Sequence, residues 1–208
     1  MTLHVWWLFV LAVVVLCGTP GPNMLHVMTR SVRFGLRRSL AAMAGCLVAL
    51  VIVLCASALG LSAVMMASPW LFGVLRYVGV AYLLYLGIRA WRGGDAPLDV
   101  GSGAIGAYGS SAQLFRGGFA IGISNPKLLL FAAAFLPQFV DRTQPQGTQF
   151  AILIATFAVV EAGWYAIYAT GGAKLVAYLD RPAAMRVFNR VTGALFIGFG
   201  VALLGVRV

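Results

Sequence analysis

The chain has 208 residues, of which 62% are hydrophobic and only 10% are charged, and its formal net charge is +10. A soluble domain carries roughly 25% charged residues, so this composition excludes a cytosolic enzyme, a disulfide-rich secreted scaffold and a disordered tail. Because a transmembrane helix takes roughly 20 apolar residues, a chain of this hydrophobicity can supply about six spans. We therefore expect an all-α, polytopic membrane protein.

Three apolar segments make up the first half of the chain, at Leu3–Met28, Ser39–Met66 and Trp70–Ala90. The first segment is interrupted by Pro20-Gly21-Pro22-Asn23, where proline removes backbone donors and leaves carbonyls without helical partners. Residues 92–114 follow the third segment and are rich in glycine and serine, which predicts a flexible cytoplasmic linker.

The second half repeats this arrangement, with apolar segments at Phe115–Val140, Thr148–Gly172 and Val187–Val206. Its first segment is also interrupted, at Asn125-Pro126-Lys127. Two directly fused units of three spans must have opposite orientations, because three is an odd number. The sequence therefore predicts two inverted three-helix repeats, 1–91 and 115–208, with helices 1 and 4 broken by proline, as in many secondary transporters.

The basic residues are distributed unevenly among the predicted connections. Eleven Lys and Arg residues fall in the connections after the first, third and fifth spans, whereas only Arg142 and Arg207 clearly fall on the opposite side. Cytoplasmic loops carry such an excess of Lys and Arg, so we expect both termini outside the cell. The positive charge is then a topology signal, and no nucleic-acid partner is expected.

The motif Pro20-Gly21-Pro22-Asn23 is a candidate binding element. Freed backbone groups at membrane depth are tolerated only where protein or a water-filled cavity satisfies them. The functional interpretation is a broken helix that exposes carbonyls and amides to a zwitterionic substrate. The alternative is a proline kink, or the end of the helix just before Arg30.

Lys127 and Glu161 are charged residues inside predicted spans. A cation placed centrally costs at least about 2.5–3.5 kcal/mol unless it is paired or hydrated. We interpret Lys127 as a cavity group for a substrate carboxylate or a fixed countercharge, and Glu161 as a proton-coupling group or a ligand for a substrate ammonium. The alternative is a static ion pair between the two. Tyr165 and Tyr168, which follow Glu161, are further candidates for the pocket, with packing as the alternative.

The cysteines and histidines form no recognisable metal or redox pattern. Cys17, Cys46 and Cys55 all lie in the first half without a CxxC pair, and His4 and His26 are far apart. We therefore predict no catalytic residues, no metal site and no cofactor. The alternative functions are an exporter of a metal ion or another small solute, a transmembrane thiol–disulfide carrier and a structural subunit.

Taken in order, these features resemble the LysE/RhtB family of amino-acid exporters, over nearly the whole chain. The homoserine/threonine exporter branch is the most similar, and there an acidic residue, commonly aspartate, occupies the position of Glu161. The resemblance rests on an ordered set of motifs: Pro20-Gly21-Pro22-Asn23, Gly79-x-x-Tyr82-Leu83-x-Tyr85-Leu86-Gly87, Gly117-Gly118-Phe119, Asn125-Pro126-Lys127, Leu136-Pro137-Gln138-Phe139 and Gly193-x-Leu195-Phe196-x-Gly198.

The resemblance implies an antiporter that exports amino acids or close derivatives across the bacterial inner membrane, driven by the proton gradient and working by alternating access. We expect Lys127 and Asn125 to face the substrate carboxylate and Glu161 to face the ammonium or the coupling proton. Asn23 and the carbonyls freed by the first break would complete the polar lining. The expected partners are a small-molecule substrate and membrane lipid, with a homo-oligomer left open.

Overall fold

A computed structural model describes residues 1–19, 21–67, 110–141, 143–179 and 181–205, together with separate positions between 70 and 92. Within these residues the chain forms helices and no strand, which confirms the all-α prediction. Pro20, most of the expected linker and much of the third expected span lie outside the described residues. The elements are α1 (Leu3–Gly18), α2 (Pro22–Phe34), α3 (Leu36–Ala67), α5 (Ser111–Ile123), α6 (Pro126–Ala134), the 3-10 turn η1 (Leu136–Phe139), α7 (Gln146–Leu179) and α8 (Pro182–Gly205).

Several helices have the length and composition of membrane spans. Helices α3 and α7 are long and apolar enough to cross a bilayer over Leu36–Gly60 and Gln146–Gly171. Helices α1 and α2 meet the same criterion as a pair, and they are bent by 54° where they meet. The described residues therefore contain up to three candidate spans, the pattern of a membrane protein.

Both predicted helix breaks are present. The first separates Gly18, the last residue of α1, from Pro22, the first residue of α2. The second separates Ile123 at the end of α5 from Pro126 at the start of α6. Each proline occupies the first position of its helix, where a missing N–H costs no intrahelical hydrogen bond.

The basic loop expected between the first two spans is reduced to one residue. Helix α2 continues to Phe34 and α3 begins at Leu36, so the four arginines of this region lie inside helices. Gly35 alone makes the turn, with a φ of 81° that favours glycine. The prediction of a longer loop was wrong because arginine is a good helix former, so charge alone does not end a helix.

Two boundaries in the second half also differ from the expectation. Helix α5 begins directly after Ser110, inside the segment 92–114 assigned to the linker, because Ser110 and Gln113 form a capping box. Helix α7 continues to Leu179 and α8 begins at Pro182, so most of the expected basic connector is helical.

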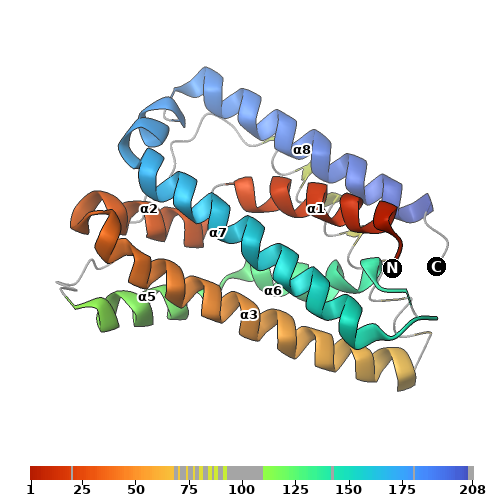
Figure 1. The fold of residues 1–208 in the computed structure, drawn as a ribbon. Coiled ribbons are helices and arrows are strands. Elements are labelled where there is room, and N and C mark those ends of the chain that lie inside the picture. Colours follow the sequence, from red (N-terminus) through yellow and green to blue (C-terminus); the bar gives the residue numbers. More distant parts are fainter. Residues whose placement is uncertain are drawn as a thin grey trace.

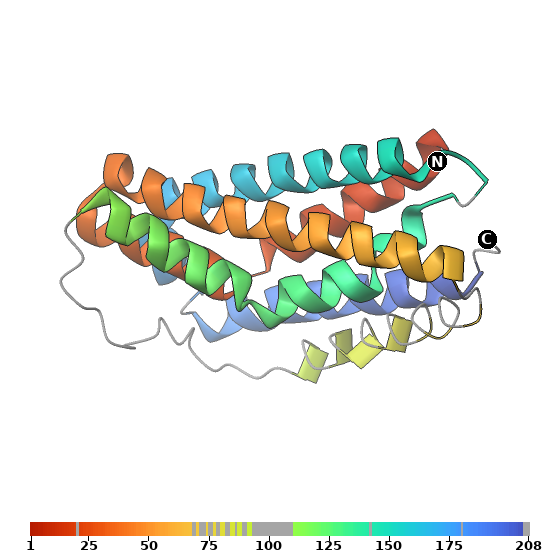
Figure 2. The same cartoon turned by 90° about the horizontal axis from the view of Figure 1, so that it is seen from below.

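The helices lie side by side along one common direction (Figures 1 and 2). The chain start, the end of α3, the loop before α7 and the last turns of α8 lie at one end of the molecule. The turn between α2 and α3, the start of α5, the end of α7 and the start of α8 lie at the other. We call this second end the basic end, because these helix ends carry Arg33, Arg37, Arg38, Arg116, Arg181 and Arg186.

Helices α3 and α5 approach each other closely through glycine. A Cβ atom at Gly45 would collide with the carbonyl oxygen of Phe115, and one at Gly118 would collide with that of Ala42. The Cys46 thiol lies 3.3 Å from the Gly118 carbonyl oxygen in the same interface. Small residues allow such close backbone contact between membrane helices, and this contact holds α5, and with it the second break, against α3.

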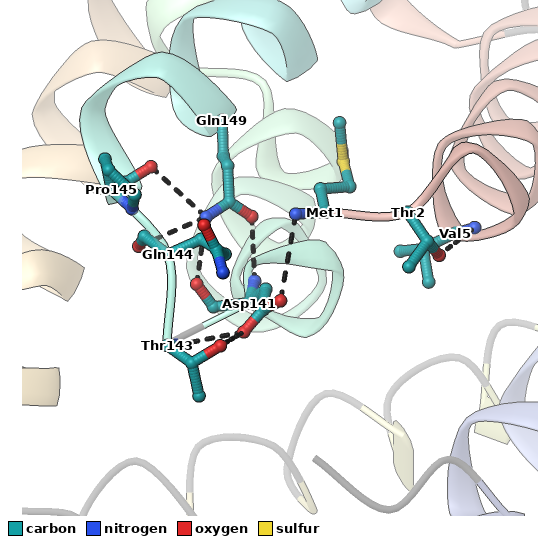
Figure 3. Close-up of polar contacts among 8 residues, drawn as sticks. All are labelled: Met1, Thr2, Val5, Asp141, Thr143, Gln144, Pro145 and Gln149. Atoms are coloured by element: carbon teal, nitrogen blue, oxygen red, sulfur yellow. Dashed lines mark hydrogen bonds and ion pairs between the residues drawn. The ribbon is translucent and has the colours of Figure 1, made fainter.

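The loop before α7 is fixed by Asp141 and Gln149 (Figure 3). The Gln149 side chain accepts from the Asp141 backbone N–H at 2.8 Å and donates to the Asp141 carbonyl oxygen at 2.9 Å. The Asp141 carboxylate accepts from the Thr143 hydroxyl at 2.7 Å and from the Thr143 backbone N–H at 2.9 Å. These two bonds hold the pKa of Asp141 below its ordinary value, because they favour the charged form.

The close α3–α5 contact predicts that a methyl group added at one of its glycines lowers the stability of the protein, whereas one added at an uncrowded glycine does not. Gly118→Ala should destabilise the protein by about 1–3 kcal/mol, because the two backbones must move apart to admit the methyl group. Gly163→Ala is the matched control, since none of the described residues outside its own helix lies within 4 Å of a Cβ at Gly163. Thermal unfolding in detergent measures both. Equal melting temperatures for the two variants would contradict the close contact.

Asp141 predicts a pH dependence of the loop before α7. Because its pKa is lowered in the folded protein, its stabilising contribution is complete above the ordinary value of about 3.9 and is lost as pH falls through the lowered pKa. The melting temperature of the wild type should therefore approach that of Asp141→Asn between pH 5 and pH 2. A constant difference across this range would show that the Thr143 bonds do not stabilise the fold.

Candidate functional site

The two helix breaks meet through the side chain of Lys127. This residue lies in the first turn of α6, and its ammonium donates to the Leu16 carbonyl at 2.6 Å, the Thr19 carbonyl at 3.1 Å and the Thr19 hydroxyl at 2.9 Å. A cation is favoured at the C-terminus of a helix and disfavoured at the N-terminus. The side chain therefore extends away from the start of α6 and caps the end of α1.

Helix α7 supplies further donors to the end of α1. The Trp164 indole N–H donates to the Val14 carbonyl at 3.0 Å, and the Tyr168 hydroxyl donates to the Gly18 carbonyl at 2.9 Å. The last carbonyls of a helix have no partner within it, and at membrane depth other protein groups or water must satisfy them. Carbonyls that the first break frees are thus bonded to Lys127 and Tyr168 in this structure.

Asn125 positions Lys127. Its side chain is the N-cap of α6 and accepts from the Lys127 backbone N–H at 3.0 Å. An N-cap of this kind satisfies one of the free N–H groups at a helix start. The cap fixes the direction of the first turn of α6, and so the point from which the lysine side chain leaves the helix.

Asn23 is the second residue of α2, whose N-cap is Gly21. Its side-chain amide donates to the Tyr165 hydroxyl at 3.0 Å, and both residues are buried. Within the described residues, the Asn23 side-chain oxygen has no hydrogen-bond partner. A buried acceptor without a donor costs free energy, so this oxygen is suited to a ligand that brings its own N–H or O–H group.

A small cavity of about 10 Å³ lies between the two breaks and α7. Glu161 reaches it from α7 and is only 6% exposed, and Lys127 reaches it from α6. Among the described residues these two charged groups do not come within the 4.0 Å of an ion pair, so the alternative of a static pair is not what this structure shows. The cavity is lined by Leu16, Cys17, Asn23, Leu50, Asn125, Lys127, Leu128, Phe157 and Glu161.

The charges around the cavity are separated. Its positive side consists of Lys127 and the N-termini of α2 and α6, which carry partial positive charge. Its negative side is Glu161, which interacts with the neighbouring Cys17 and Tyr165 side chains. Such a site can hold a carboxylate on one side and an ammonium on the other.

Four of the residues singled out in the sequence line the cavity together: Asn23, Asn125, Lys127 and Glu161. Tyr165 joins them through its bond to Asn23.

The other sequence-predicted residues have supporting positions. A Cβ at Gly21 would lie 3.6 Å from the Lys127 ammonium, so this glycine adjoins the cap of α1. Pro22 and Pro126 begin α2 and α6. Tyr168 holds the end of α1 through Gly18 and is absent from the cavity lining.

Sequence reasoning missed three contributors to the site. Thr19, which gives Lys127 two oxygen atoms, could have been found as a hydroxyl residue next to the break. Trp164 follows Glu161 by three positions and therefore shares its helix face. Cys17 could not have been found from the sequence, because a cysteine in an apolar run indicates packing.

The three cysteines of the chain are unpaired, and the described residues contain no cluster of three potential metal ligands.

The hydrogen bond from the Tyr168 hydroxyl to the Gly18 carbonyl predicts that removal of this hydroxyl group lowers the stability of the protein. Tyr168→Phe leaves the buried Gly18 carbonyl without its donor, which should cost about 1–3 kcal/mol of stability. Tyr77→Phe is the control, since Tyr77 is 66% exposed. The measurement is thermal unfolding of both purified variants. A Tyr168→Phe protein as stable as wild type would show that the bond to Gly18 contributes nothing to the stability of the fold.

Comparison with known proteins gives the family of the chain. The LysE type translocator family matches residues 5–206. The chain is 32% identical to the homoserine/homoserine lactone efflux protein of Salmonella typhimurium, over 100% of this chain and 99% of that protein. It is 32% identical to an uncharacterized membrane protein of Vibrio cholerae, over 98% of each.

A third relative is the leucine efflux protein of Salmonella choleraesuis, which is 28% identical over 95% of this chain and 93% of that protein. No solved structure matches the chain. Because the family match covers nearly the whole sequence and includes both helix breaks, the chain belongs to the LysE type translocator family.

Proposed function

We propose that this protein exports a small amino acid, or a close derivative of one, from the bacterial cytoplasm. Its family is a translocator family, and similar proteins are named for the efflux of homoserine, homoserine lactone and leucine. The observation that carries the proposal is the cavity at the two breaks, where Lys127 and Glu161 present opposite charges without pairing. A zwitterion complements these charges.

The substrate carboxylate binds on the positive side of the cavity. The N-termini of α2 and α6 meet there, and in transporters such half-helix N-termini point at anionic substrate groups. Lys127 and Asn125 belong to this side. The ammonium binds Glu161, with the Asn23 side-chain oxygen as a second acceptor that has no partner within the described residues.

Transport requires the cavity to open. Its volume of about 10 Å³ is far below the roughly 300–1,000 Å³ of typical ligand sites, and buried side chains surround it. A substrate carboxylate competes with the Leu16 and Thr19 carbonyls for the Lys127 ammonium. When Lys127 transfers to the carboxylate, α1 loses its link to α6, and this release permits alternating access.

Glu161 also serves as the proton-coupling group. A carboxylate that holds an ammonium releases it once the carboxylate is protonated, because the charge attraction is lost. Protonation from outside and deprotonation toward the cytoplasm would couple export to proton entry, as in an antiporter. Export should therefore weaken when the pH gradient is collapsed.

The whole chain forms six spans in two inverted halves, 1–91 and 115–208, joined by the linker 92–114. The direction of the described helices supports this arrangement (Figure 2). The broken pair α1–α2 runs toward the basic end, whereas α5–α6 runs away from it. Helices α3 and α7, the second elements of the two halves, also run in opposite directions.

The basic end faces the cytoplasm, and the protein lies in the bacterial inner membrane with both termini outside. The excess of arginine at one end of the bundle supports this orientation, since cytoplasmic loops are enriched in Lys and Arg. The start of α1 and the last turns of α8 both lie at the opposite end (Figure 2), which is consistent with an even number of spans.

The test compares efflux from cells challenged with single amino acids and dipeptides. Glu161→Gln should lower export at least tenfold for every solute that the wild type exports, because the amide carries no charge and takes up no coupling proton. Unchanged export with an unchanged pH dependence would remove Glu161 from the mechanism.

Asp141→Asn is the matched control. It makes the same acid-to-amide change in the loop before α7, outside the cavity, and should retain wild-type export. Equal losses in both variants would indicate a general effect of charge or folding, and would count against the cavity as the transport site.

A further inference from the structure

Helix α2 buries a polar face. Asn23, His26 and Arg30 are spaced by three and four residues, which places them on one side of a helix. Their exposed fractions are 2%, 7% and 9%. Helix α2 also buries Met24, Val27 and Met28, so its buried surface combines a polar face with an apolar one.

This polar face runs from the cavity toward the basic end. Asn23 lines the cavity at the start of α2, His26 lies one turn further, and Arg30 lies one turn beyond it. Helix α2 ends at the basic end of the molecule (Figure 2). The three side chains therefore mark a continuous line from the substrate cavity to the face assigned to the cytoplasm.

His26 faces α5 across a position without a side chain. A Cβ at Gly117 would lie 3.6 Å from His26 Cε1 and 3.7 Å from His26 Nε2, and outside its own helix no other atom of the described part of the chain lies within 4 Å of it. Among the described residues, His26 Nε2 has no hydrogen-bond partner although it is buried. A buried ring nitrogen without a partner is costly, and a passing polar solute or water would satisfy it.

Helix α2 is also fastened to α7. Asn23 donates to the Tyr165 hydroxyl at 3.0 Å, and the Ser31 hydroxyl donates to the Ala169 carbonyl at 2.6 Å. These two bonds tie α2 to α7 at positions before and after His26. The interface between α2 and α5, where Gly117 leaves room, is therefore the side on which a path can widen while α2 stays attached to α7.

We propose that the cytoplasmic access path to the cavity runs between α2 and α5, lined by His26, Arg30 and Gly117, and that it takes solutes bearing a carboxylate. His26 Nε2 binds the solute in passage, and the Arg30 guanidinium receives its carboxylate. The location of the path rests on the contacts of α2 and α5, and only the identity of the solute rests on the proposed function.

The charge around the mouth favours an anionic group. Arg33 and Arg37, on either side of the turn after α2, and Arg116, next to Gly117 on α5, are all exposed. A cluster of like charges at the mouth of a path raises the local concentration of the opposite charge. A carboxylate is therefore drawn to the α2–α5 interface before it reaches the buried part of the path.

The test is the reaction of an introduced thiol in sealed membrane vesicles that contain the full chain. In inside-out vesicles, sulfonatoethyl methanethiosulfonate, an anionic reagent that does not cross the membrane, should modify His26→Cys at least tenfold faster than Val27→Cys. Val27 is the matched control, since it adjoins His26 on α2 and is completely buried in the apolar core. Labelling of the unsubstituted chain, with its three native cysteines, is subtracted.

Equal rates for the two variants, or reaction of His26→Cys only in right-side-out vesicles, would overturn the path. Gly117→Cys probes it from α5 and should show the same sidedness, so the result does not depend on the folding of a single variant. After correction for reactivity with a free thiol, the anionic reagent should react faster than its trimethylammonium analogue. The reverse order would overturn the preference for carboxylates.

These outcomes are independent of the exported solute. If the thiols react as expected but the protein exports no amino acid, the access path is supported and the proposed function is refuted. Export without thiol reaction at either position would keep the proposed function and place the path elsewhere.

Discussion

The architecture depends on a lysine ammonium placed on the carbonyl end of a broken helix. Lys127 would cost at least about 2.5–3.5 kcal/mol as an unpaired charge at membrane depth, and among the described residues the Thr19 carbonyl would lack a donor where α1 stops. The three hydrogen bonds of Lys127 solve both problems at once. Because the partners lie in different halves of the chain, the same contact joins the halves at their breaks.

This arrangement explains why a cavity with separated charges can exist in a tightly packed bundle. The attraction of Lys127 is satisfied by α1, so Glu161 need not be neutralised by it and keeps its place on the cavity wall. Close contact of α3 with α5 and the hydrogen bonds from α7 hold the surrounding helices. In the proposed mechanism the Lys127 contact exchanges while these surrounding helices stay in place, so the protein opens at a defined place.

The prolines and charged residues inside otherwise apolar segments were the features of the sequence that predicted the structure best. Both proline breaks and the shared location of Lys127 and Glu161 could be predicted, because charges and prolines inside apolar segments have few tolerable environments. The hydrogen-bond partners of Lys127 could not be predicted, since no local sequence pattern relates position 127 to Leu16 and Thr19. The single-residue turn at Gly35 was missed because arginines were taken to end the helices they belong to.

That turn has a mechanical consequence. At about 1.5 Å per residue, the 32 residues of α3 extend about 48 Å, well beyond the roughly 30 Å of a bilayer's hydrocarbon core. Because Gly35 alone separates α3 from α2, a change in the tilt of α3 is transmitted to α2 with little slack. The thickness of the surrounding lipid, which biases the tilt of α3, can therefore act on the cavity between the two breaks through the directly connected helices α3 and α2.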